Sequence, residues 1–142
     1  MFCSPIRRNN EQVIITDRPL LANQNLYISN TGNNSNTVLR WRVGDSNGTI
    51  VAGTLNSPGS NPTQLNFPTG ITVDQWKNLY VNDRSNDRIQ LFCNGNLTGI
   101  TIAGRGVGGT NFSQPFDVKL DSQLNLYVVD NTQHRVYKFT KL

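Results

Sequence analysis

The chain has little of what helices, metal sites and disulfide scaffolds require. Among its 142 residues there are one Glu, one His and two Cys. Apolar residues nowhere recur at helical spacing without Gly, Pro or Asn interrupting them, so helix is not expected as a major element. Cys3 and Cys93 are too few for a disulfide framework, although an oxidising compartment would leave them free to pair.

Long apolar and long basic runs are also missing. No stretch reaches the ~18 apolar residues of a membrane helix, so no membrane partner is expected. The first residues, MFCSPIRRNNEQV, lack the apolar segment of a secretory signal. Glycosylation acceptor sequences, which suit a secreted chain, nevertheless begin at Asn33, Asn47, Asn96 and Asn111. The two observations point in opposite directions and leave the compartment open.

Charge is sparse and slightly basic. Thirteen Lys and Arg against nine Asp and Glu give a net charge of +4, and only Arg7 and Arg8 are adjacent. This distribution favours an ordinary basic surface over a nucleic-acid footprint.

Residues that form turns are abundant, and the chain repeats itself. There are 20 Asn, 12 Gly and 6 Pro, which favour short strands joined by tight turns. NLYVNDRSNDRIQLF, residues 78–92, returns 47 positions later as NLYVVDNTQHRVYKF, residues 125–139, and NLY also occurs at residues 25–27. Within a unit, apolar and polar residues alternate with a period of two, as in half-buried strands. A unit of 40–50 residues with about four strands is typical of a propeller blade.

The sequence therefore predicts an all-β fold of about three propeller blades, each with four antiparallel strands, in an incomplete ring. The blades cover residues 13–53, 67–104 and 114–142, after a flexible arm at 1–12. In the second unit strands are expected at 70–73, 78–82, 88–93 and 98–103, and in the third at 117–120, 125–129 and 135–139. In the first unit they are expected at 25–29, 38–43 and 49–52. Val13-Ile14-Ile15 is either the innermost strand of the first unit or the outer strand missing from the third.

The alternation also predicts which side chains are buried. These are Ile71, Val73, Leu79, Val81, Ile89, Leu91, Ile100, Ile102, Val118, Leu120, Leu126, Val128 and Val136.

Three blades do not close a ring, because propellers normally have four to eight. Two apolar blade faces, on the first and third units, should therefore be exposed. Either the chain is a fragment of a longer propeller protein, which is the favoured explanation, or two copies form a homodimer that closes a six-bladed ring.

The motif P-x-G-[IV]-x-[VL]-D-x-x-x-N-L-Y-V-x-D-x-x-N-x-R-[IV] resembles the NHL repeat family. Residues 68–89 carry it most fully, whereas the third unit has Asp117 for the Gly and Gln133 for the second Asn. The first unit has Asn30 for the Asp and Thr37 for the Arg. The resemblance implies a β-propeller, usually six-bladed, that binds proteins, peptides or RNA.

Asp and Arg at the centre of the motif have a structural explanation. Asp83 closes the turn after the second strand and Arg88 opens the third, where its guanidinium reaches the carboxylate. Asp130 and Arg135 are expected to repeat this arrangement. The functional reading is a ligand face at this turn, with candidates at Arg84, Arg88, Arg105, His134 and Arg135.

Catalytic patterns are weak. His134 with two distant Cys is too little for a zinc site. Residues 104–109 fit G-x-G-x-x-G, but the following TNFSQP cannot begin the helix that a dinucleotide site needs, so the run is expected to link two blades. NHL-like lyases and related lactonases depend on His, Glu and Asp in the central channel, which this chain scarcely supplies.

We therefore expect a non-catalytic interaction module without cofactor, binding a protein or peptide on a loop face. The alternatives are RNA binding through a basic face, and a fragment of an NHL-like lyase or lactonase.

Overall fold

The computed structural model describes residues 11–13, 25–32 and 35–140. Regular structure in these ranges consists of short β-strands and one 3-10 turn, η1. Their bounds are β1 (Glu11–Val13), β2 (Asn25–Asn30), β3 (Thr37–Arg42), β4 (Thr49–Ala52), β5 (Pro68–Val73), β6 (Leu79–Asp83), η1 (Arg84–Asn86), β7 (Arg88–Phe92), β8 (Ile100–Gly104), β9 (Asp117–Leu120), β10 (Leu126–Asp130) and β11 (Arg135–Phe139). No helix among the described residues has the length and apolar character needed to cross a membrane.

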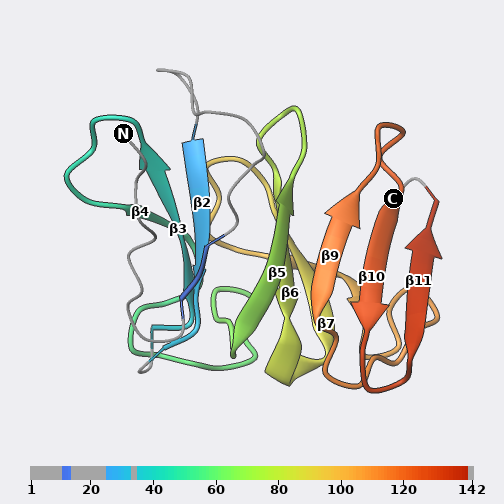
Figure 1. Ribbon diagram of the computed structural model, residues 1–142. Coiled ribbons are helices and arrows are strands. Elements are labelled where there is room, and N and C mark those ends of the chain that lie inside the picture. The colour runs from blue at the N-terminus through green and yellow to red at the C-terminus, as the bar shows by residue number, and fades with distance from the viewer. Residues whose placement is uncertain (1–10, 14–24, 33–34, 141–142) are drawn as a thin grey trace.

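The strands form three antiparallel sheets that stand side by side (Figure 1). Sheet 1 is ordered β1-β2-β3-β4, sheet 2 is β5-β6-β7-β8, and sheet 3 is β9-β10-β11. Within each sheet, every strand thus pairs with the next one along the chain, as in the blades of a propeller. The predictions of an all-β fold and of three blades in an incomplete ring are confirmed. Each predicted strand of the three units is present.

The first sheet settles one open alternative and corrects one boundary. β1 pairs with β2, with Val13 opposite Ile28, so this segment is the innermost strand of sheet 1 and not a fourth strand of sheet 3. It begins at Glu11, so residues 11 and 12 belong to the sheet and not to the predicted arm. Residues 1–10, Ile14 and Ile15 lie outside the described residues.

Gly70 explains why the motif has glycine on its innermost strand. β5 and β9 lie against each other, and Gly70 N–H donates to the Phe116 carbonyl at 3.3 Å. A Cβ on Gly70 would lie 2.6 Å from the Cα of Asp117, closer than real side chains allow. The glycine is therefore required by the close approach of two neighbouring sheets. Asp117 replaces it in sheet 3, where no described strand packs beyond β9.

The core consists of two apolar clusters, each shared between neighbouring sheets. The first joins sheets 1 and 2 and the second joins sheets 2 and 3, so sheet 2 contributes to both. Cluster 1 contains Val38, Ala52, Leu65, Ile71, Leu79, Val81 and Phe92, and cluster 2 contains Ile89, Ala103, Phe112, Val118, Leu126 and Val128. Burial of this kind, at roughly 25 cal/mol per Å² of apolar surface, is what holds successive blades together.

Burial was predicted correctly at most positions and wrongly at two. Of the predicted core, Ile71, Leu79, Val81, Ile89, Val118, Leu126 and Val128 are buried, and Val73, Leu91, Ile102 and Leu120 are half-buried. Ile100 is 57% exposed because it opens the edge strand β8 at the rim of sheet 2. Val136 is 64% exposed although Ile89, its equivalent 47 residues earlier, is 0% exposed. The difference arises because sheet 3 covers Ile89 and no described sheet covers Val136.

The outer side of sheet 3 is the exposed apolar blade face that the repeat arithmetic predicted. It carries Phe116, Val129 and Val136, all exposed, and we call it the open face. The equivalent residues of sheet 2 are buried against sheet 3, namely Thr69, Asn82 and Ile89. On the outer side of sheet 1, Leu26 and Ile28 are half-buried, whereas their equivalents Leu79 and Val81 are buried.

We expect the open face to promote self-association, because exposed apolar patches on stable domains mark interfaces. The purified chain should have a mass above 15.8 kDa by light scattering on a sizing column. Val129→Asn together with Val136→Lys should restore the mass of one chain, because both side chains lie on the open face. A parent chain that is monomeric at all concentrations would contradict this expectation.

Candidate interaction surface

One end of the strands collects the long connections and most of the predicted site residues. It consists of residues 53–67, 84–87, 105–116 and 131–134 and lies at the lower end of Figure 1; we call it the loop face. Arg84, Arg105 and His134 lie in these connections, and Arg88 and Arg135 open the adjoining strands β7 and β11. The structure thus gathers the candidates at one end of three sheets.

Arg88 is structural, and its place among the ligand candidates was wrong. It is buried, and its Nε donates to Asp83 Oδ2 at 2.7 Å. Its Nη1 donates to the Ser60 carbonyl at 2.8 Å, and its Nη2 donates to the carbonyls of Asn61 at 3.2 Å and Gln64 at 3.1 Å. With these donors engaged inside the protein, Arg88 anchors the 53–67 connection to the turn and offers nothing to a partner.

Asp83 is the acceptor at the centre of this turn. Asn66 N–H and Asn86 Nδ2 donate to it at 2.7 and 2.8 Å, in addition to Arg88. Burial raises the pKa of the Asp83 carboxyl above its usual value, and the donors from Asn66, Asn86 and Arg88 oppose that rise. Asp83 thus accepts one backbone and two side-chain donors at this turn.

The expectation that Asp130 and Arg135 repeat the ion pair was wrong. Asp130 is buried and keeps the backbone part of the arrangement, accepting from Ser113 N–H at 2.8 Å and Gln133 N–H at 3.0 Å. Arg135 is exposed, and no ion pair joins it to Asp130 in the described part of the chain. Gln133 instead holds the preceding connection by donating from Nε2 to the Asn111 carbonyl at 3.0 Å.

Arg84 is a half-buried cation on the loop face that contacts two of its connections. Its guanidinium carbon lies 5.5 Å from the centroid of the Phe67 ring, and its Nη2 donates to Gln114 Oε1 at 3.2 Å. Phe67 and Gln114 hold equivalent positions before sheets 2 and 3, both with positive φ, of 55° and 53°. Arg84 therefore bridges the entries to two sheets. We call Phe67, Arg84 and Gln114 the bridge patch.

A side chain of the preceding unit holds the backbone of Phe67 in place, and the same is true of Gln114. Phe67 N–H donates to Asn36 Oδ1 at 2.7 Å, and Gln114 N–H donates to Asp87 Oδ1 at 2.6 Å. Because the backbone is held, Phe67 stays 37% exposed on the surface and does not fold into the core. The sequence carries one signal for Phe67, which is an aromatic side chain in a connection where the third unit has Gln114.

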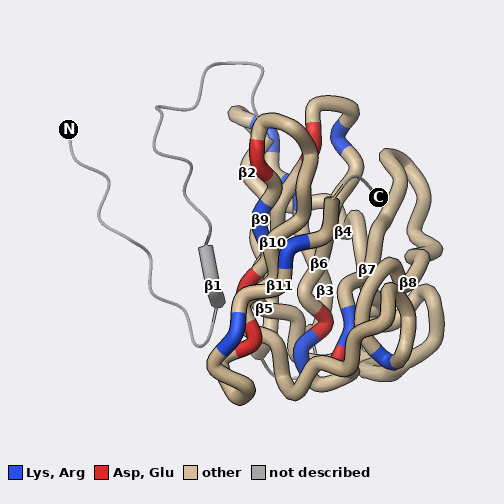
Figure 2. Tube along the Cα trace, turned by 90° about the vertical axis from the view of Figure 1, so that its right-hand side faces the viewer, with Lys and Arg blue, Asp and Glu red and all other residues tan. Residues whose placement is uncertain are grey.

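The other candidates are accessible but separate. Arg105, His134 and Arg135 are exposed, and Arg105 and His134 lie in left-handed turns with φ of 53° and 51°. In the described ranges no hydrogen bond or ion pair joins any two of them. Figure 2 shows basic and acidic residues interspersed along the strand ends without a single basic field.

The glycine-rich run links two blades, as the sequence indicated. Gly104 ends β8 with φ of 86°, and a Cβ there would collide with the Asp87 carbonyl. Gly53 has the same relation to the Asn36 carbonyl in sheet 1. Residues 105–110 continue as hydrogen-bonded turns, including Gly106 N–H to the Thr110 carbonyl at 2.9 Å, and no helix follows within the described residues.

The acidic residues at the opposite strand ends are engaged in their own turns. Asp74 accepts from Trp76 N–H at 2.9 Å and from Asn78 N–H at 2.8 Å, and Asp121 accepts from Gln123 and Asn125 N–H in the same way, both at 2.9 Å. Hydrogen bonds, chiefly from the Asn125 side chain, lower the pKa of Asp121. Each carboxylate thus shapes a turn. No cluster of three His, Cys, Asp or Glu that could hold a metal occurs within the described ranges.

The described asparagines of the glycosylation acceptor sequences lie on the surface. Asn47, Asn96 and Asn111 are exposed, and Asn33 lies outside the described residues. Cys93 is an exposed free thiol, and Cys3 is not described.

Neither a protein family nor a curated protein sequence matches the chain. Solved structures do match, at the level of the fold. An auxiliary nutrient binding protein from Bacteroides ovatus is 20% identical, with a TM-score of 0.66 over 80% of this chain and 34% of its own. A streptogramin B lyase is 17% identical, with a TM-score of 0.63 over 91% of this chain and 36% of its own.

A protein of unknown function from Bacteroides thetaiotaomicron is similar as well, with 18% identity and a TM-score of 0.69 over 82% of this chain and 32% of its own. The chain therefore spans about a third of the length of the solved structures that it matches. At these identities the likeness shows the fold alone, a propeller-like array of antiparallel sheets.

Proposed function

We propose that the chain is a non-catalytic interaction module of the NHL type that binds a protein or peptide on its loop face. The observation that carries this proposal is the bridge patch, in which an exposed aromatic ring is stacked under an ordered arginine. Aromatic residues and arginine are the types enriched in the cores of protein interfaces, where a few of them supply most of the binding energy.

The order of the patch supports the proposal further. Phe67 and Arg84 are held by contacts to neighbouring sheets, so little conformational entropy is lost when a partner covers them. Of the similar solved proteins, two are described as nutrient binding and two as lyases. A binding role for this chain agrees with the first description.

The proposal is tested by selecting peptides from a displayed random library on the immobilised chain and measuring their affinity. Phe67→Gln and Arg84→Asn should each weaken the selected peptide at least ~10-fold, because each removes half of the stacked pair. Both changes copy the residue that the third unit has at the same place, Gln114 and Asn131, so the fold should tolerate them. Arg42→Asn, at the opposite strand end, is the control and should bind normally.

Two results would overturn the proposal. One is that no peptide is selected, or that the selected peptides bind both variants as well as the parent. The other is that single-stranded RNA binds more tightly than any peptide, with an affinity that falls steeply as salt rises, since counterion release is the mark of phosphate contacts. The second result would establish the RNA alternative, for which the half-buried Arg84 and the exposed Arg105 and Arg135 are the candidate residues.

A further inference from the structure

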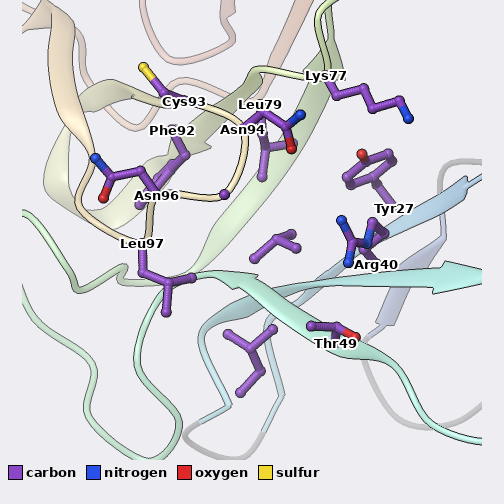
Figure 3. A pocket seen from close by; sticks show the side chains of 13 residues that line it. Tyr27, Arg40, Thr49, Lys77, Leu79, Phe92, Cys93, Asn94, Asn96 and Leu97 are labelled. Atoms are coloured by element: carbon purple, nitrogen blue, oxygen red, sulfur yellow. The ribbon is translucent and has the colours of Figure 1, made fainter.

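A second candidate site lies away from the loop face, at the opposite strand ends between sheets 1 and 2. A cavity of about 260 Å³ opens there between β3 and β4 on one side and the end of β7 with residues 93–97 on the other (Figure 3). Its volume is just below the usual range of ligand pockets, roughly 300–1,000 Å³. A ligand of about ten non-hydrogen atoms would fill it.

One part of the cavity is apolar. Its wall includes Leu79 and Phe92, which belong to the core shared by the two sheets, together with Ile50 and Leu97. Leu97 is 51% exposed and forms part of the rim that Figure 3 shows at the lower left. An apolar body placed here would leave water and gain hydrophobic free energy.

The other part of the cavity is basic. Arg40 and Lys77 line it and also line an adjoining polar cavity of about 440 Å³, which adds Arg42 and Asp45. Figure 3 shows the guanidinium of Arg40 directed toward the cavity. Three cations against one carboxylate leave this region with an excess of two positive charges, by subtraction of Asp45 from Arg40, Arg42 and Lys77.

Arg40 has a buried donor with no partner among the described residues. Its Nε is buried and makes no hydrogen bond within the described ranges, and no ion pair there involves Arg40 or Lys77. Buried donors of native proteins are nearly always paired, and a charged donor is costly when it is not. An acceptor from outside the chain would satisfy it.

The equivalent positions at the junction between sheets 2 and 3 show whether the fold itself requires these two cations. Arg40 pairs across the strands with Tyr27, and Leu91 pairs with Tyr80 in the same way. Lys77 has φ of 68°, and Leu124 has the same place and conformation in the third unit, with φ of 64°. The junction between sheets 2 and 3 therefore has leucines where the junction between sheets 1 and 2 has both cations.

The third sheet shows what a paired cation looks like at this position. Lys138 is the counterpart of Arg40 there, and its Nζ lies 5.4 Å from the centroid of the Tyr127 ring. Arg40 makes no such contact with Tyr27 in the described ranges, so its charge stays available to a ligand.

The far wall of the cavity is formed in advance. Asn96 N–H donates to the Cys93 carbonyl at 2.9 Å and Thr98 N–H to Asn96 Oδ1 at 2.9 Å, which closes the 93–98 turn. Asn94 N–H donates to Asn78 Oδ1 at 3.1 Å and ties the turn to the strand that follows Lys77. Binding would need little rearrangement of this wall.

We propose that this cavity binds a small organic anion, with its charged group between Arg40 and Lys77 and its apolar body against Phe92 and Leu97. The chemistry required is a carboxylate or phosphate carried on one short alkyl or aryl group. Arginine and lysine both bind either anionic group, and the apolar wall selects against anions that lack a body.

Cys93 lines the cavity and is an exposed free thiol, so it can report on occupancy. The experiment follows alkylation of Cys93 by iodoacetamide under reducing conditions, read by peptide mass spectrometry, with glutathione in the same solution as the reference thiol. The probes are 3-phenylpropanoate and phenyl phosphate, with 3-phenyl-1-propanol and inorganic phosphate for comparison.

We expect the two aryl anions to slow alkylation of Cys93 at least ~3-fold at saturation without affecting the reference thiol. The uncharged alcohol and inorganic phosphate should act only at concentrations at least ~10-fold higher, since each supplies half of the interaction. Whichever aryl anion is protective at the lower concentration identifies the preferred charged group.

The double variant Arg40→Leu, Lys77→Leu copies the junction between sheets 2 and 3 and should fold. It should need at least ~10-fold more aryl anion for the same protection, whereas Arg105→Leu, which removes one charge on the loop face, should leave protection unchanged. No protection in the parent, equal protection by the alcohol, or equal weakening by Arg105→Leu would each overturn the proposal.

Discussion

Replacing Val81 with aspartate is expected to unfold the chain. Val81 lies in the middle of β6, fully buried, with Ile71 and Gln90 opposite it on the neighbouring strands. An aspartate there would place a carboxylate inside the core shared by sheets 1 and 2, with no cation to pair with. Such burial costs about 4 kcal/mol or more, a large part of the roughly 5–15 kcal/mol that holds a domain together.

The measurement is far-ultraviolet circular dichroism with urea unfolding of the purified variant. The control is Val43→Asp, which makes the same chemical change at a residue that is 54% exposed and lies away from the open face. The control should change the free energy of unfolding by less than about 0.5 kcal/mol. A Val81→Asp chain that unfolds at the parent's urea concentration would show that β6 does not face the core.

Replacing Arg88 with methionine should have the second largest effect. The change removes the cation that Asp83 contacts at 2.7 Å and leaves a buried carboxylate with only neutral donors. Loss of one partner of a buried ion pair typically costs about 3–5 kcal/mol. Arg135→Met, at the equivalent but exposed position, should cost less than about 0.5 kcal/mol.

The stability of the Arg88→Met variant should also depend on pH, which provides a second test of this prediction. Burial already raises the pKa of Asp83 above its usual value of 3.8, and loss of Arg88 removes a lowering influence, so the pKa rises further. A carboxyl whose pKa is higher in the folded than in the unfolded state takes up a proton more readily when folded. Folding of the variant is therefore favoured as pH falls below the raised pKa and disfavoured as pH rises through it.

Urea unfolding of the parent and Arg88→Met at pH 7.5 and pH 5 tests this sign. The free-energy difference between the two chains should be smaller at pH 5, and Arg135→Met should show no such dependence. An equal difference at both pH values would mean that the Asp83 carboxyl is not what the variant destabilises.

The fold could be predicted because its information is local and repeated. Alternation at Ile71 and Val73, or at Leu126 and Val128, marks strands whatever surrounds them, and the 47-residue offset places each strand within its blade. Burial could be predicted from the repeat only where each unit has the same neighbouring sheets. Ile89 and Val136 hold the same repeat position and have similar neighbours in the sequence. Only Ile89 is covered by another sheet, and the residues around it do not indicate this.

The two candidate sites depend on contacts between units, so the sequence predicted Arg84 as a candidate but neither its contact with Phe67 nor the cavity. Arg84 reaches Gln114 in the entry to the next sheet, thirty residues away. Arg40 and Lys77 come from different sheets, and the turn before β3, two residues longer than its counterpart, hides the equivalence of Arg40 with Leu91. The Asp83–Arg88 pair was foreseen because its partners are five residues apart, within one turn.

The sharing of both apolar clusters by sheet 2 has a consequence for how the chain comes apart. In an array where each unit contacts only its neighbours, stability is a sum of nearest-neighbour terms, and end units lose one such term while the middle unit would lose two. Opening therefore begins at sheets 1 and 3 and reaches sheet 2 last. We therefore expect amide protons of β6 and β7 to exchange only through global unfolding of the chain.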